Sequence, residues 1–185
     1  MMTRTRQTAA ELAISDSGVL AGLCRFDATV VSTILVGLDT GSSDIDIVCS
    51  FQSIDDFVSA ANSQCEHFSQ FSLNRKQDVV IVRFVFAGFP FEIYACPLPV
   101  SEQAAYRHFR IMQRLVALGG ELFQEKVVAL KNSGLKTEPA IASTLGLTGD
   151  SSADLSTNLP TDPYAAVLEL EGLSDEQLRE LLIQG

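Results

Sequence analysis

The stretch Gly41-Ser42-Ser43-Asp44-Ile45-Asp46-Ile47-Val48 decides how the rest of the sequence is interpreted. It opens with turn-forming residues and continues as a strand pattern in which acidic and apolar residues alternate. On a strand, Asp44 and Asp46 project from one face with Cα atoms about 6.5–7 Å apart, and Ile45 and Ile47 project from the other. Two carboxylates this close repel each other unless a cation lies between them. The pattern predicts a rigid site for Mg²⁺, with the alternative that both acids only solvate the start of a strand.

A third acid, Glu92, lies within an apolar run over residues 89–96 that is expected to be a strand. An acid in such a run is costly to bury unless it is paired, protonated or bound to a metal. If this strand packs beside residues 44–50, Glu92 completes a cluster of three carboxylates. The alternative is a structural salt bridge with Arg83 on the preceding strand.

The apolar pattern places strands before helices. Strands are predicted over residues 28–37, 44–50, 79–86 and 89–96. Helices are predicted as two short pieces over residues 7–24 and then over 53–67, 101–118, 121–131, 138–145 and 162–183. This order predicts an α+β (mixed α/β) domain, in which a mixed sheet with flanking helices is followed by a helical C-terminal half.

The length of 185 residues fits one domain with a short appendage. We expect residues 1–147 to form the α+β domain, including its helical half. Residues 148–161 are rich in Ser, Thr, Asp and Asn, which predicts a flexible polar linker or loop. Residues 162–185 are expected to form an acidic helical segment that covers the core of the same domain, with a partner surface as the alternative.

Net charge, cysteine spacing and the length of apolar runs indicate which partners and which compartment to expect. The net charge of −10 disfavours nonspecific nucleic-acid binding, which needs cations to displace counterions from phosphates. The four cysteines lack zinc-ligand spacing, which favours buried, reduced thiols. No apolar run approaches the ~18 residues that cross a bilayer, and the N-terminus has no signal-peptide pattern. We therefore expect a cytoplasmic protein without a membrane partner.

Three short motifs follow one another in a recognisable order. Ser32-Thr33 is followed, after ten residues, by Asp44-Ile45-Asp46-Ile47, and Phe91-Glu92-Ile93 comes later. This order resembles the signature of the nucleotidyltransferase superfamily, which has the DNA polymerase β-like fold. The chain resembles more closely a small bacterial family of unknown function within that superfamily, through residues 38–39, 43–47, 91–94, 105–108 and 134–140.

The resemblance implies roles for individual residues. Asp44, Asp46 and Glu92 would be the catalytic carboxylates and would hold Mg²⁺ or Mn²⁺, with two ions expected. The nucleotide contacts that it implies are Ser32 and Thr33, and we also expect Ser43, beside Asp44, and the cations Arg107 and Lys136 to contact the nucleotide. Ser32 stands where the superfamily has glycine, and its Cβ is expected to hinder close approach of the backbone to a triphosphate.

The activity implied is Mg²⁺-dependent transfer of an NMP unit from an NTP to a hydroxyl group of a small molecule or protein. Such a reaction needs charge neutralisation and in-line positioning from the protein. Two alternatives stay open. One is a non-catalytic module that keeps the fold and binds a nucleotide or a protein. The other is a metal-dependent hydrolase that uses the same carboxylates.

The helical half carries further cations. Arg107, Arg110 and Arg114 recur at helical spacing and form one face, which suits triphosphate oxygens or an acidic acceptor, with a solvated face as the alternative. His108 on the same helix is expected to be packed and hydrogen-bonded. Thr137 is expected to cap the helix that follows Lys136.

Overall fold

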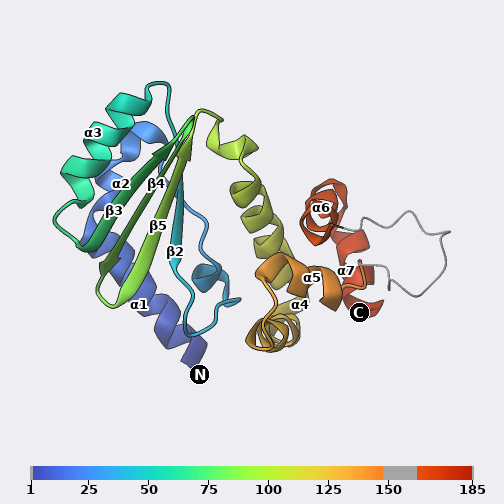
Figure 1. Cartoon of the computed structure of the whole chain (residues 1–185). Coiled ribbons are helices and arrows are strands. Elements are labelled where there is room, and N and C mark those ends of the chain that lie inside the picture. The colour runs from blue at the N-terminus through green and yellow to red at the C-terminus, as the bar shows by residue number, and fades with distance from the viewer. Residues whose placement is uncertain (1, 148–161, 185) are drawn as a thin grey trace. The chain divides into compact units, whose positions relative to one another are not determined.

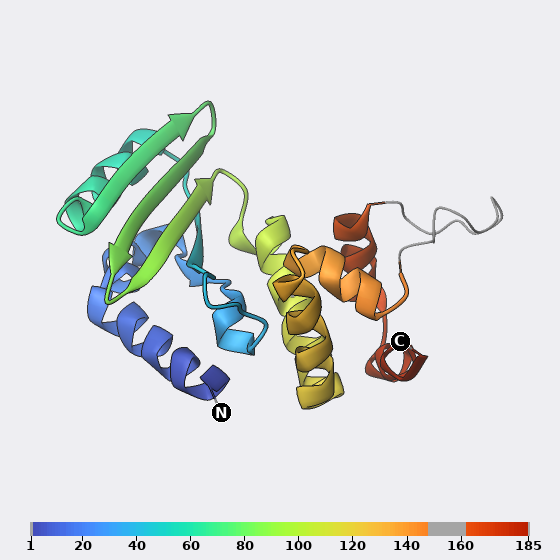
Figure 2. The same ribbon diagram turned by 60° about the horizontal axis from the view of Figure 1, so that its bottom comes forward.

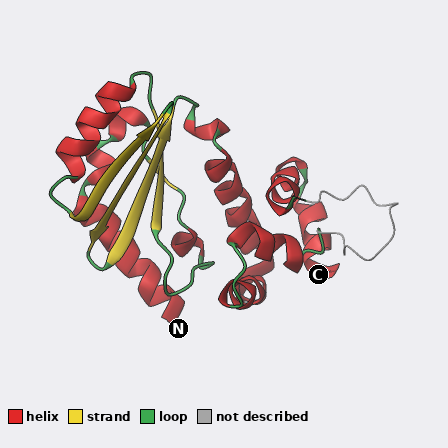
Figure 3. Cartoon of the chain, in the orientation of Figure 1, coloured by secondary structure: helices red, strands yellow, loops and turns green. Residues whose placement is uncertain are grey.

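The computed structural model describes residues 2–147 and 162–184, with side chains from residue 5 onward. The chain forms two compact units, Met1–Tyr106 and Arg107–Gly185. Within the described residues the sheet belongs to the first unit and the second unit is helical (Figure 3). The expected α+β class is confirmed. The assignment of residues 1–147 to one domain stays a prediction, and the expected linker over 148–161 lies outside the described residues.

A mixed sheet of five strands in the order β1-β2-β5-β4-β3 organises the first unit (Figure 1). Its central pair, β2 and β5, is parallel, and the other pairs are antiparallel. Figure 2 shows β3, β4 and β5 as consecutive strands joined by tight turns. The strands are β1 (Thr29–Val30), β2 (Ile45–Ser50), β3 (Ser69–Lys76), β4 (Val79–Phe86) and β5 (Phe89–Cys96).

Helices α1 (Met2–Ser17), α2 (Val19–Gly22) and α3 (Ile54–Cys65) pack on one face of this sheet (Figure 1). The apolar residues of β2, β4 and β5 alternate, so every second side chain enters the core that these helices cover. The largest fully buried side chains of this core are Phe57, Phe84, Phe91, Leu23, Ile34, Ile45, Ile47 and Ile93.

Several elements lie where the sequence predicts them. The strands over 79–86 and 89–96 have the expected bounds. Ala87 and Gly88 both adopt positive φ, as a tight hairpin turn requires. Helix α3 begins after Ser53, whose hydroxyl accepts a hydrogen bond from the backbone N–H of Asp56. The expected break in the N-terminal helix occurs at Gly18, which has φ of 65°.

The strand predicted over 28–37 is wrong. Only Thr29–Val30 pairs with β2, and the chain then forms the 3₁₀ helix η2 (Thr33–Val36). The reason is Ser32, whose side chain accepts a hydrogen bond from the N–H of Ile34 and so starts a helical turn. A serine hydroxyl that bonds the local backbone competes with the sheet ladder, although the run is rich in β-branched residues.

The second unit contains the helices expected there. Helix α4 (Ala104–Asn132) is broken at Gly120, which has φ of 60° and ψ of −154°, so the two predicted helices are separate segments. Helix α5 (Thr137–Thr144) is followed in the described chain by α6 (Pro163–Glu169), the 3₁₀ helix η4 (Leu170–Gly172) and α7 (Asp175–Gln184). Helix α6 packs against α5. Thr137 is the first helical residue rather than the cap, and Lys136 occupies the cap position without a side-chain bond.

Candidate functional site

The carboxylates of the central strands lie on the face of the sheet opposite the core of the first unit. Asp46 on β2 and Glu92 on β5 are register partners in the parallel pair. Their neighbours Ile45 and Ile93 are buried in the core, so the two acids project to the other face. Asp44 precedes Asp46 by two residues and lies immediately before β2. This register is the one that the hypothesis of a carboxylate cluster requires.

A row of polar residues continues from these acids across the sheet. Arg83 on β4 is the register partner of Glu92, and Ser72 on β3 is the register partner of Arg83. We call Asp46, Glu92, Arg83 and Ser72 the polar row. It crosses β2, β5, β4 and β3 in order. The Arg83 side chain of this row lies directly beside Glu92.

Arg83 and Glu92 form an ion pair within the polar row. The Nε of Arg83 donates to Oε2 of Glu92 at 2.7 Å, and its Nη2 lies 2.5 Å from the same oxygen. The Arg83 side chain is 50% exposed and the Glu92 side chain is 30% exposed. The salt bridge between Glu92 and Arg83, which was the alternative prediction for Glu92, is therefore present.

Tyr94 lies next to the polar row. It follows Glu92 by two residues on β5, so its side chain projects from the same face of the sheet, and it is 37% exposed. Partial burial raises the pKa of its phenol, with a smaller contribution from Cys96. Tyr94 therefore stays neutral at physiological pH and offers a ring and a hydroxyl beside the acids.

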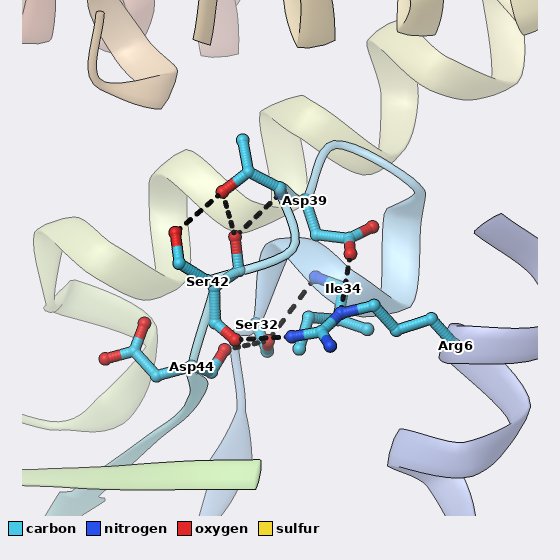
Figure 4. Close-up of polar contacts among 8 residues, drawn as sticks. Arg6, Ser32, Ile34, Asp39, Ser42 and Asp44 are labelled. Atoms are coloured by element: carbon cyan, nitrogen blue, oxygen red, sulfur yellow. Dashed lines mark hydrogen bonds and ion pairs between the residues drawn. The ribbon is translucent and has the colours of Figure 1, made fainter. Parts of the chain in front are cut away.

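Within residues 2–147 and 162–184, no group of three or more His, Cys, Asp or Glu side chains is arranged to hold a metal ion. Oxygen Oε2 of Glu92 is directed to Arg83, and Figure 4 shows the Asp44 carboxylate turned away from Arg6 and Ser32. The donor chemistry nevertheless suits a hard cation, because carboxylate oxygens are the ligands that Mg²⁺ prefers. The expected pair of ions stays a prediction.

Ser32 ties the 3₁₀ helix η2 to the start of β2. Its side chain is fully buried, and its hydroxyl donates to the backbone carbonyl of Asp44 at 2.8 Å (Figure 4). The same oxygen accepts the N–H of Ile34 at 3.4 Å. Thr33 is the first residue of η2. The Ser32 hydroxyl is thus occupied by structural hydrogen bonds, and nucleotide contacts by Ser32 and Thr33 stay predictions.

The loop before β2 is held by an ion pair that the site prediction did not include. Arg6 on α1 donates from Nη2 to the carbonyl of Ser43 at 2.9 Å, and its Nε lies 3.0 Å from Oδ2 of Asp39 (Figure 4). The Asp39 side chain is 6% exposed. The guanidinium of Arg6 also lies over the ring of Phe89, 5.0 Å from its centroid. The feature of the sequence that could have indicated this ion pair is Asp39, because an acid next to the apolar residue Leu38 needs a partner if it is buried.

Ser43 closes the same loop. Its hydroxyl accepts a hydrogen bond from the backbone N–H of Thr40 at 2.9 Å. The turn thereby fixes the approach to Asp44, and the predicted contact of Ser43 with a nucleotide stays untested.

In the second unit, the arginine face of α4 binds the C-terminal segment. Arg107 donates from Nε to Oε2 of Glu171 at 2.9 Å, and Arg114 donates to Oδ1 of Asp175 at 2.8 Å. The hydrogen bond between Arg107 and Glu171 raises the pKa of the guanidinium and lowers that of the carboxyl. Two of the three predicted surface cations are thus paired within the unit. Lys136 is exposed at the start of α5.

His108 is packed among the helices of the second unit, as the sequence predicts. It is 7% exposed, and its Nε2 lies 3.1 Å from the carbonyl oxygen of Tyr164 on α6. Its Nδ1 lies 3.6 Å from Oε1 of Glu138 on α5. These contacts connect three helices, which accounts for the histidine without a catalytic role.

None of the helices in the described part of the chain is long and apolar enough to cross a membrane.

Comparisons with known proteins agree with this architecture. Residues 12–170 match the protein-family model described as "Domain of unknown function (DUF4269)". No curated protein matches the chain. The Cid1 poly(U) polymerase bound to MgGTP is similar with a TM-score of 0.60 and 13% identity, over 78% of this chain and 51% of the polymerase. A mutant of Cid1 bound to MgATP is similar with a TM-score of 0.56 and 13% identity, over 88% of this chain and 48% of that chain.

These similarities establish the fold. The first unit carries a nucleotidyltransferase-type mixed sheet, as the motif order predicts. At 13% identity the likeness extends to the fold alone, and the chain spans about half the length of these polymerases.

Proposed function

Because this chain belongs to the DUF4269 family and has a nucleotidyltransferase fold, we propose that it is a nucleotidyltransferase that moves an NMP unit from an NTP to a hydroxyl group. The observation that carries the proposal is the register of β2 and β5. It sets Asp46 beside Glu92 on the sheet face opposite the core, with Asp44 two residues away. This register brings two acids from distant parts of the chain to the same face of the sheet, and phosphoryl transfer depends on positioning and on stabilisation of charge.

Each acid has a proposed role. Asp44 and Asp46 hold the divalent cation, Mg²⁺ or Mn²⁺, which when bound supplies charge neutralisation for the phosphates. Glu92 accepts the proton of the attacking hydroxyl. A bond forms between that hydroxyl oxygen and the α-phosphorus, the bond from this phosphorus to the bridging oxygen breaks, and pyrophosphate leaves.

Five further residues are proposed as nucleotide contacts. In the first unit these are Ser32, Thr33 and Ser43, which lie in or before the loop that leads to Asp44. Arg107 and Lys136 are the proposed contacts from the second unit. Arg107 becomes available only when it leaves Glu171, since the two are paired in this structure.

The acceptor is proposed to be a small molecule or a protein. The structural neighbour Cid1 is a poly(U) polymerase by its description. This chain carries a net charge of −10, which opposes binding along a nucleic-acid backbone.

The test is Mg²⁺-dependent release of pyrophosphate from NTPs, measured with a panel of hydroxyl-bearing small molecules and proteins. Asp44→Asn and Asp46→Asn should each lower the rate by at least about a hundredfold, because each removes charge from the cation site. Asp78→Asn is the matched control, since Asp78 is exposed in the turn between β3 and β4. Equal rates for the wild type and Asp44→Asn would contradict the proposal.

A second candidate is a non-catalytic module that binds a nucleotide or a protein. It is favoured by the buried Ser32 hydroxyl and by the ion pair that occupies one oxygen of Glu92. Calorimetric titration with MgATP separates the two functions. Binding of MgATP without turnover on any acceptor supports the module, and turnover rules it out.

A further inference from the structure

A hollow of about 620 Å³ lies in the first unit, at the end of β2 that is farther from Asp44. Its volume falls within the range of about 300–1,000 Å³ that is usual for sites of small ligands. Ser50, the last residue of β2, lines this hollow. Because a strand rises about 3.3 Å per residue, Ser50 lies about 20 Å from Asp44. The hollow is therefore separate from the acids of the polar row.

Aromatic rings form the apolar part of the hollow. Phe26 and Phe51 line it and are 6% and 5% exposed. Both rings pack on Phe57 of α3, with centroid distances of 5.0 Å and 5.8 Å. The backbone N–H of Phe51 also donates to the carbonyl of Cys96, at the end of β5, at 3.2 Å. Contacts within the core thus hold these rings in place, so the hollow exists before a ligand binds.

Arg25 supplies the positive charge of the hollow. Its guanidinium lies over the ring of Phe26, 4.7 Å from the centroid, and its Nη2 donates to the backbone carbonyl of Asp56 at 3.3 Å. These two contacts orient the side chain. A guanidinium has five N–H groups, and those of Arg25 that have no partner among the described residues are available to the carboxylate of a ligand.

Two carboxylates supply the negative charge. Asp27 and Asp56 line the hollow and are exposed. Neither carboxylate forms a hydrogen bond or an ion pair with the residues that the structure describes, since Arg25 bonds the backbone of Asp56. Both carboxylates are therefore available to a donor from a ligand.

These charges select the class of ligand. A ligand with a negative charge alone would pair with Arg25 and be repelled by the two carboxylates. A ligand with a positive charge alone would pair with a carboxylate and leave Arg25 unmatched. A ligand with both charges matches both kinds of side chain, which is how a site discriminates among ligands of similar size.

We propose that this hollow binds a small zwitterion of the amino-acid class. The ligand carboxylate accepts hydrogen bonds from Arg25, and its ammonium group donates to the carboxylates of Asp27 and Asp56. Its carbon chain lies against the rings of Phe26 and Phe51. This site is independent of the proposed nucleotidyl transfer, because it shares no residue with the polar row.

The test uses four five-carbon compounds. Norvaline and 5-aminopentanoate are zwitterions that differ in the separation of their charges, pentanoate is an acid, and pentylamine is an amine. Each compound is titrated into the full chain, and binding is followed by calorimetry and by the backbone amide NMR signals of residues 25–27 and 50–56. We expect a zwitterion to shift these signals and to bind at least about tenfold more tightly than the acid and the amine, because it makes an additional charge-assisted hydrogen bond.

Variants test the two charges separately. Arg25→Gln should weaken binding of that zwitterion about tenfold, and so should the double variant Asp27→Asn with Asp56→Asn. Asparagine tolerates the left-handed backbone of Asp27, which has φ of 54°. Arg179→Gln and Asp78→Asn are the matched controls, because both residues are exposed and neither lines the hollow. Thermal unfolding checks that each variant retains the fold.

Several results would overturn the proposal. One is equal affinity for the zwitterions and the singly charged compounds, and another is the failure of all four compounds to bind. Zwitterion binding that leaves the signals of residues 25–27 and 50–56 unshifted would also overturn it, as would a loss in the control variants equal to that in Arg25→Gln. Pyrophosphate release from NTPs does not enter any of these outcomes, so the proposed function stands or fails separately.

Discussion

Two buried polar side chains hold the loop that presents Asp44. Ser32 bonds the backbone on both sides of this loop, and Asp39 pairs with Arg6 of α1. Buried polar groups stabilise a fold only while their partners are in place, because a lost partner leaves an unsatisfied group. The acid at the start of β2 is thus positioned by residues that do not themselves face the polar row.

Ser32→Ala tests this anchoring. It leaves the carbonyl of Asp44 and the N–H of Ile34 without the hydroxyl, and it should lower the free energy of unfolding by about 1–2 kcal/mol. Urea unfolding followed by circular dichroism measures the change. Ser42→Ala is the control, because Ser42 is exposed and its hydroxyl bonds, among the described residues, only the Thr40 hydroxyl, so its effect should stay below about 0.5 kcal/mol. Equal effects of the two substitutions would refute the anchoring role of Ser32.

The sequence indicated the acids of the site but could not decide between their possible partners. Alternation along β2 predicts that Asp44 and Asp46 share a face, and the apolar run around Glu92 predicts that this acid needs a partner. Whether the partner is a cation or Arg83 depends on the pairing of β4 with β5, which is a long-range property. The pair of Arg6 and Asp39 joins residues that are far apart in the chain, and no local pattern connects them.

At the scale of elements, strongly periodic segments were predicted well and weakly apolar ones were not. Strands β4 and β5 are apolar runs around a tight turn, and both have the predicted bounds. Strand β3 was missed because its sequence, SQFSLNRK, is mostly polar. It lies at the edge of the sheet, where exposed polar and charged residues are expected. For β1 the predicted strand was too long. The run over residues 28–37 is apolar throughout, and its composition did not indicate the helical turn that starts at Ser32.

Gly120 determines the break in helix α4. Its φ of 60° and ψ of −154° are accessible almost only to glycine, and a Cβ there would meet no atom within 4 Å from the described residues beyond its chain neighbours and its own helix backbone. Gly120→Ala should therefore destabilise the second unit by about 1–3 kcal/mol through backbone strain alone. Chemical denaturation followed by circular dichroism measures this loss.

Gly172→Ala is the control for this substitution. A Cβ at Gly172 also meets nothing within 4 Å, and its φ lies outside the left-handed region. It should change stability little. A loss at Gly172 as large as that at Gly120 would contradict the assignment of strain to Gly120.

At the scale of the whole molecule, some charged side chains form ion pairs that stabilise the fold, and others belong to the candidate site. The arginines of α4 bind Glu171 and Asp175, so the acidic C-terminal segment is held within the second unit. The order of strands and helices predicted the α+β class, because it depends on local pattern alone. The division into units at Tyr106 and Arg107 was not predicted, since it falls within a continuous helical segment.

We propose above that Asp44 and Asp46 hold a divalent cation and that Glu92, on the neighbouring strand, serves the same site of nucleotidyl transfer. The most direct measurement is a crystal structure of the protein with Mn²⁺ and a non-hydrolysable NTP, in which anomalous scattering locates the manganese. We expect manganese bound by Asp44 and Asp46, with Glu92 beside the α-phosphate and Arg83 still hydrogen-bonded to one oxygen of Glu92. Nucleotide and manganese bound away from the polar row, or no manganese in contact with Asp44 and Asp46, would contradict it.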